Sequence, residues 1–204
     1  KEYWDRETID GKPYKIPFVD NLVMRTIGDS QTRLAAFRTG KIDVMANINW
    51  DELKSLAPIQ DKIKVIEHPD YAGEALAMRV DAPPFDNQKV RLALNLAVDR
   101  AAISKQIYGG HADFPHLPMD ETWEGYFTPP EKMPNEAREV LQYDPAKAKK
   151  LLAEAGLANG FEFKAQVPSF PEQLKKAQIV AGYLSAIGVK MTIEPKEYGA
   201  FLSL

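Results

Sequence analysis

The stretch FEFKAQVPSFPEQLKKAQIVAGYLSAIGVKMTIEP, residues 161–195, decides the fold class of this chain. Apolar and polar residues alternate over 161–167 and again over 189–193, which is the period of a half-buried strand. Between them, Pro171 opens a segment with apolar residues at helical spacing, and Gly188 ends it. A strand, a helix and a strand in this order form a right-handed parallel βαβ unit. The sequence therefore predicts an α/β fold.

The helix expected before this unit lies in YDPAKAKKLLAEAG, residues 143–156. Asp144 is a good N-cap, Pro145 suits the first helical position, and Gly156 stands just beyond the last apolar residue. All the usual start and stop signals of a helix are present here.

A further pair of helices is expected in PPFDNQKVRLALNLAVDR, residues 83–100, and the residues after it. The two prolines disfavour helical backbone before Phe85, and Asp86 is the expected N-cap of the first helix. Asp99 is the expected N-cap of the second helix, which ends at Gly109-Gly110. We therefore expect two short helices that meet at a corner.

The first part of the chain reads as alternating strands and helices. NLVMRTI (21–27) and KIDVMA (41–46) have strand character and flank a helix with a C-terminal glycine, SQTRLAAFRTG (30–40). A short capped segment then leads to a second expected strand pair, KIKVIEH (62–68) and EALAMRV (74–80). This order also predicts α/β structure.

Composition excludes several classes of function. The chain has 204 residues, of which none is cysteine, so it forms neither disulfides nor thiolate metal sites. Its net charge is −3 with both signs mixed, whereas a nucleic-acid surface needs a concentrated basic patch. No stretch reaches the roughly 18 consecutive apolar residues of a membrane-spanning helix.

The common catalytic motifs are missing from the sequence. One short motif could bind a metal ion. The chain has no GxSxG nucleophile motif and no glycine-rich phosphate loop. His111, Asp113 and His116 in HADFPH could ligate a metal ion, and the alternative is a polar loop that happens to contain two histidines. No cofactor is expected.

Amide and aromatic residues favour a binding surface instead. In ANINW (46–50), Asn47, Asn49 and Trp50 directly follow an expected strand, and ligands gather beyond the carboxyl ends of strands in open α/β sheets. The long segment 111–143 has no regular period and carries Trp123 and Tyr126. A long loop of this kind is usually functional or flexible. These five residues are the candidate ligand contacts, and packing against the core is the alternative for each aromatic ring.

Three ordered motifs resemble a known family. TRLAAFRTGKIDVM, PPFDNQKVRLALNLAVDRAAI and YDPAKAKKLLAEAG…GFEF, together with YW near the start, resemble the extracytoplasmic solute-binding proteins of ABC transporters. The branch is family 5, which includes dipeptide-, oligopeptide- and nickel-binding proteins. In that family the PPF…VR…DR motif is scaffold, so the resemblance implies that the ligand contacts lie elsewhere.

The resemblance implies a periplasmic-binding-protein-like fold of type II with two lobes, present here only in part. Residues 1–75 would be part of lobe I and 76–204 the first part of lobe II. Part of the first lobe and the extra domain of this branch would lie before Lys1, and the rest of the second lobe after Leu204. It also implies a monomeric, non-enzymatic protein that captures a peptide-like solute and delivers it to a membrane permease. The expected location is the periplasm or the outer face of the cytoplasmic membrane, with or without a lipid anchor.

Several alternatives stay open on the sequence alone. The solute of such a protein could be an oligosaccharide or nickel instead of a peptide. From other classes, a metal-dependent enzyme using His111, Asp113 and His116, or the ligand-sensing domain of a regulator, would fit the same fold.

Overall fold

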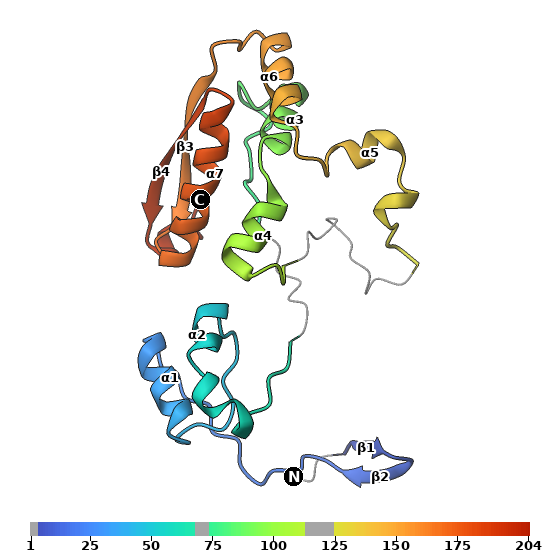
Figure 1. The fold of residues 1–204 in the computed structure, drawn as a ribbon, viewed down its shortest axis with the longest axis vertical. Coiled ribbons are helices and arrows are strands. Elements are labelled where there is room, and N and C mark those ends of the chain that lie inside the picture. Colours follow the sequence, from blue (N-terminus) through green and yellow to red (C-terminus); the bar gives the residue numbers. More distant parts are fainter. Residues whose placement is uncertain (1–3, 68–73, 113–124) are drawn as a thin grey trace. The chain divides into compact units, whose positions relative to one another are not determined.

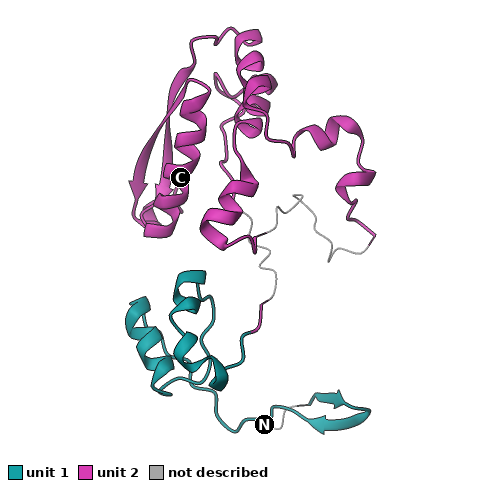
Figure 2. Ribbon diagram, in the orientation of Figure 1, with its two compact units in different colours: residues 1–65 teal, residues 66–204 magenta. Residues whose placement is uncertain are grey.

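The computed structural model describes residues 4–67, 74–112 and 125–204. The chain divides into two compact units, Lys1–Val65 and Ile66–Leu204 (Figure 2). Each unit is described by itself below. The assignment of residues 1–75 and 76–204 to two lobes stays a prediction.

A parallel strand pair forms the centre of the second unit, as predicted. Strands β3 (Phe161–Pro168) and β4 (Val189–Lys196) pair in parallel with Phe161 opposite Val189, and helix α7 (Pro171–Ala186) connects them (Figure 1). The two strands start unusually close to two glycines. A Cβ atom added to Gly160, whose φ is +74°, would lie 1.8 Å from the carbonyl oxygen of Gly188. Only glycine fits there, because a side chain would force the strand starts apart.

The two faces of this strand pair differ in polarity. The face that carries the predicted inward residues Phe161, Phe163 and Ala165 belongs to the hydrophobic cluster of the unit. On the other face, ion pairs join the strands between Lys190 and Glu162 at 3.0 Å and between Lys164 and Glu194 at 2.8 Å. One face is therefore covered by helices while the other carries charged side chains.

Helices complete the core of the second unit on the apolar face. Helix α3 (Gln88–Leu96) packs against α6 (Pro145–Glu154), and the backbone N–H of Asp144 donates to the carbonyl of Leu96 at 2.9 Å. Each fully buried leucine contributes roughly 1.5–3 kcal/mol to stability. The buried members of this cluster are Val90, Ala93, Leu94, Leu96, Ala97, Ala148, Leu152, Ala165, Leu184, Ile187, Val189 and Met191.

The predicted helix starts at Asp99 and Asp144 are confirmed. The Asp99 side chain accepts from the N–H of Ala102 at the start of α4 (Arg100–Tyr108), and the Asp144 side chain accepts from that of Lys147, both at 2.8 Å. Helix α4 ends at Gly109, whose φ is +63°.

The prediction that Asp86 is the N-cap of helix α3 is wrong. The cap of α3 is Asn87, whose side chain accepts from the N–H of Lys89 at 2.9 Å. The N–H of Asp86 belongs to a turn, because it donates to the carbonyl of Ala82 at 3.1 Å. The turn delays the helix by one residue and puts Asn87 in the capping position.

The segment 111–143 contains more regular structure than expected. In its described part, a 3₁₀ turn η2 (Pro130–Lys132) is followed by the short helix α5 (Asn135–Glu139). The chain ends with the short helix α8 (Tyr198–Phe201).

The first unit contains a hairpin and three short helical segments. Strands β1 (Arg6–Ile9) and β2 (Lys12–Lys15) pair antiparallel. Helix α1 (Ser30–Arg38) forms as predicted, capped by Asp29, and is followed by α2 (Trp50–Lys54) and the 3₁₀ segment η1 (Ala57–Lys62). The Arg38 guanidinium donates to the carbonyl of Ser55 at 2.5 Å, which joins the end of α1 to the end of α2.

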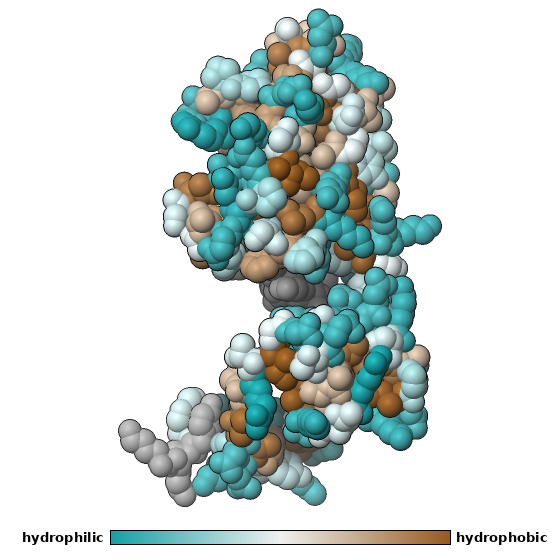
Figure 3. Space-filling model, turned by 90° about the vertical axis from the view of Figure 1, so that its left-hand side faces the viewer, coloured by the Kyte–Doolittle hydropathy of each residue, from teal (hydrophilic) through white to brown (hydrophobic). Residues whose placement is uncertain are grey.

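The four strands predicted in the first eighty residues are absent from the described parts of those segments. Residues 21–27, 41–46, 62–67 and 74–80 contain no strand. Several of their apolar side chains are exposed: Met24 is 87% exposed and Val44 is 82% exposed. Figure 3 shows, on one face of the molecule, hydrophobic residues scattered among hydrophilic ones. A strand needs a hydrogen-bonded neighbour, and no described segment pairs with these four. The prediction of strands in these segments is therefore wrong, because the sequence pattern does not show whether a segment has a strand to pair with.

Among the helices of the described residues, none is both long enough and apolar enough to cross a membrane.

Alanine substitutions at Asn87 and Asp86 should show which of the two residues caps helix α3. We expect Asn87→Ala to lower the free energy of unfolding by about 1 kcal/mol, because it removes the side-chain acceptor at the start of α3. Asp86→Ala should change that free energy by less than about 0.5 kcal/mol, as at most exposed positions. Urea denaturation of both variants measures this; a larger loss for Asp86→Ala would contradict the cap assignment.

The glycine contact at the strand starts gives a second prediction. Gly160→Ala should destabilise the protein by more than about 1 kcal/mol, because its φ is positive and its Cβ would meet the Gly188 backbone. The matched control is Gly182→Ala inside α7, where a Cβ meets nothing within 4 Å and should add roughly 0.5–1 kcal/mol of stability. Equal effects of the two substitutions would contradict the close approach.

Candidate functional site

The candidate residues Asn47, Asn49 and Trp50 lie together on one turn of chain that leads into helix α2. Asn47 is exposed and has a φ of +55°, a left-handed conformation that asparagine tolerates better than most residues. Trp50 is the first residue of α2 and is half-buried. The three residues are neighbours in the chain, and no strand precedes them.

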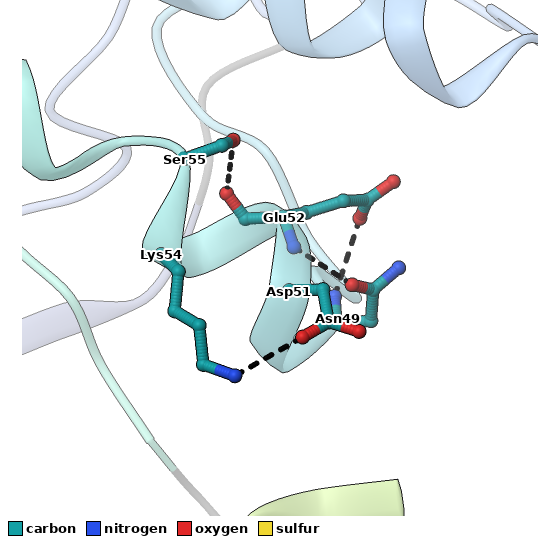
Figure 4. A network of polar contacts seen from close by, with 5 residues as sticks. All are labelled: Asn49, Asp51, Glu52, Lys54 and Ser55. Atoms are coloured by element: carbon teal, nitrogen blue, oxygen red, sulfur yellow. Dashed lines mark hydrogen bonds and ion pairs between the residues drawn. The ribbon is translucent and has the colours of Figure 1, made fainter.

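Asn49 has a structural task in this turn. Its side-chain oxygen accepts from the N–H of Glu52 at 2.8 Å, and the Glu52 carboxylate accepts from the N–H of Asn49 at 3.2 Å (Figure 4). This reciprocal capping box satisfies two backbone donors at the start of the helix. Glu52 is buried, so the box is held from the inner side of the unit.

The rest of the helix is also tied locally. Lys54 pairs with Asp51 at 3.1 Å, and the Ser55 hydroxyl donates to the carbonyl of Glu52 at 2.5 Å. In Figure 4 the Asn49 amide nitrogen points away from the bonds of the capping box. The side-chain oxygen of Asn49 is therefore used by the fold, and the amide nitrogen takes no part in the capping box.

The other two candidate aromatic residues belong to the segment after α4. Tyr126 lies in the second unit and is 74% exposed, so its ring does not serve the core. Trp123 lies outside the described residues. The proposed ligand contacts of all five residues stay predictions.

The candidate metal motif is only partly described. His111 follows the glycine end of α4, and its Nδ1 lies 3.0 Å from a carboxylate oxygen of Glu67. Asp113 and His116 lie outside the described residues. Within residues 4–67, 74–112 and 125–204, no three His, Cys, Asp or Glu side chains are grouped so that they could hold a metal ion.

A second candidate surface lies at the carboxyl edge of β3 and β4, which the sequence reasoning did not single out. The chain leaves β3 through Ser169, whose N–H donates to the carbonyl of Lys196 at 2.8 Å. Phe170 and Tyr198 follow the two strands, and their ring centroids lie 5.3 Å apart with each residue 48% exposed. An open edge of this kind is where α/β proteins commonly bind ligands. The sequence carried a signal for this pair, because both aromatic residues follow a predicted strand within five positions.

A carboxylate accompanies this aromatic pair. Glu197 caps α8, and its side chain accepts from the N–H of Ala200 at 3.2 Å. Hydrogen bonds from the backbone N–H groups of Gly199 and Ala200 lower the pKa of Glu197. Its carboxylate is therefore ionised at neutral pH. The edge thus combines flat apolar rings with a fixed negative charge.

Comparisons with known proteins identify the family. The family model described as "Bacterial extracellular solute-binding proteins, family 5 Middle" matches residues 1–203. Heme-binding protein A of Haemophilus influenzae is 33% identical over 84% of this chain and 31% of its own length. Glutathione-binding protein GsiB of Pectobacterium atrosepticum is 30% identical over 90% of this chain and 34% of its own length.

Solved structures agree with this assignment. The periplasmic binding protein DppA of Helicobacter pylori, in complex with the peptide STSA, is 32% identical with a TM-score of 0.69. The dipeptide-binding protein of Pseudoalteromonas sp. SM9913, in complex with Met-Leu, is 32% identical with a TM-score of 0.64. The match covers 87% of this chain in both, and 33% and 34% of the respective relatives.

This chain spans about a third of the length of the relatives that it matches. The names of these relatives describe binding proteins, which favours a binding role over the metal-dependent enzyme. The chain belongs to family 5 of the bacterial extracellular solute-binding proteins.

Proposed function

We propose that this protein captures a peptide-like solute outside the cytoplasmic membrane and delivers it to the permease of an ABC importer. The observation that carries the proposal is the likeness to two peptide-bound structures, each 32% identical to this chain. A relative named for glutathione, itself a tripeptide, points the same way. Lipid anchoring to the outer face of the membrane, and action as a monomer, belong to the same proposal.

The chemistry of the first unit suits a peptide. A peptide offers backbone carbonyl and N–H groups at regular spacing, and amide side chains can pair with both. Asn47 and Asn49 present such amides within three residues of one another, and Trp50 adds a flat apolar face for a side chain.

The carboxyl edge of β3 and β4 suits the same class of solute. The rings of Phe170 and Tyr198 can pack against an apolar side chain, and the ionised carboxylate of Glu197 can attract an ammonium group. We propose that this edge adds ligand contacts to those of the five residues named from the sequence.

Heme is the second candidate solute. It is favoured by one specific observation, the 33% identity to a heme-binding protein over 84% of this chain. An oligosaccharide and nickel are the remaining alternatives from the sequence, and each is an arm of the experiment.

Thermal-shift measurements on the intact protein test the proposal. We expect dipeptides, a tetrapeptide or glutathione to raise the unfolding midpoint, because a ligand that binds only the folded state stabilises it by about 2.7 kcal/mol at a hundred times its Kd. Hemin, an oligosaccharide and Ni²⁺ are run in parallel. A rise with one of these three and with no peptide would overturn the peptide assignment.

Variants of the two asparagines test the site on the first unit. Asn47→Gly removes the amide but permits the left-handed backbone, so peptide affinity should fall roughly five- to tenfold, the value of one hydrogen bond, while the unfolding midpoint is unchanged. Asn49→Ser keeps a good cap and should also weaken binding. Asn49→Ala should in addition lower the stability by about 1 kcal/mol.

Isothermal titration calorimetry measures the affinities. The control is Asn21→Gly, which removes another exposed asparagine of the same unit outside the candidate site. If Asn47→Gly and Asn49→Ser bind peptide as tightly as the control, these residues are not ligand contacts.

A further inference from the structure

A cluster around Lys176 joins three parts of the second unit that are far apart in the sequence. Lys176 lies on α7, and its ammonium is 2.6 Å from a carboxylate oxygen of Glu74 and 2.7 Å from one of Glu172. The same nitrogen lies 5.1 Å from the centroid of the Tyr108 ring at the end of α4. Gln173 also donates to Glu74, at 3.0 Å. One cation thus meets two carboxylates and an aromatic face.

This cluster differs from the other ion pairs of the described chain in its burial. The side chain of Lys176 is 11% exposed, whereas the lysines of the strand pair are 66% and 72% exposed. Exposed ion pairs contribute little, but a partly buried charge is costly when its partner is removed. Burial lowers the pKa of Lys176, and hydrogen bonds to Glu172, Glu74 and Tyr108 outweigh it and raise the pKa above its ordinary value. The ammonium therefore stays charged at all physiological pH values.

The two carboxylates have different structural consequences. Glu172 precedes Lys176 by one turn on the same helix, so their ion pair stays within α7. Glu74 is 102 residues away in the sequence and lies in residues 74–79, which form neither helix nor strand. Beyond Glu74, the segment is attached through Met78, which packs against the hydrophobic cluster.

We propose that Lys176 is a latch that fastens the segment 74–78 to helices α4 and α7. In the sequence, this segment lies near the start of the second unit, which begins at Ile66. With Met78 held by the core and Glu74 held by Lys176, the chain is fixed to the second unit from Glu74 onward. Breaking the latch would free these residues without disturbing the strand pair or its core.

Spin labelling of the intact protein tests the latch. The chain contains no cysteine, so Ala75→Cys creates a single labelling site within it. We expect the label at this position to show an immobile spectral component in the otherwise unchanged protein. Lys176→Met and, separately, Glu74→Gln should each abolish that component.

The matched controls are Glu172→Gln and Lys175→Met. Glu172→Gln removes the other carboxylate of the same ammonium but leaves the bond to Glu74, and Lys175→Met makes the same change at an exposed neighbour. Both should keep the immobile component. Glu74→Gln alters a half-exposed side chain, so it tests the latch even if Lys176→Met fails to fold. An immobile label in Glu74→Gln, or equal release by Glu172→Gln, would overturn the proposal.

Discussion

The close approach of Gly160 and Gly188 is the constraint on which the second unit depends. It brings the starts of β3 and β4 together, so that the strands pair in parallel over eight residues each. A parallel pair cannot be joined by a hairpin, and α7 must cross back along it. The crossing helix covers one face, and α3 and α6 join the same core. The other face is left to charged side chains.

Capping side chains fix the positions at which the helices begin. Asn87, Asp99 and Asp144 each satisfy a backbone donor at the start of a helix, and Asn49 does so in the first unit. Polar contacts connect the corner between α3 and α4: Arg100 donates to Asn95, which in turn donates to the carbonyl of Val140. Burial lowers the pKa of Arg100, the last residue of the motif that resembles the family.

The surfaces that suit a ligand lie where regular elements begin or end. In the first unit they are the amides and the indole ring at the start of α2, and in the second they are the aromatic pair beyond β3 and β4. Rigid elements position such side chains, and the connecting turns leave them accessible. A solute-binding protein needs this arrangement because its specificity rests on a few oriented polar groups and flat apolar faces.

The sequence by itself determined the parts of this protein that depend on local interactions. Helical spacing, capping residues and strand alternation predicted α1, α4, α6, α7 and the β3–β4 pair, because each signal lies within a few residues of the structure that it specifies. The adjacency of Asn47, Asn49 and Trp50 followed for the same reason.

Only the tertiary structure decided the rest. Residues 21–27 and 41–46 have the pattern of strands and form none, because pairing depends on a neighbour that the pattern does not encode. The turn before Asn87 took the cap from Asp86, and the ammonium of Lys176 meets a carboxylate 102 residues away. Contacts over such separations depend on the packing of the whole unit, and no local pattern specifies them.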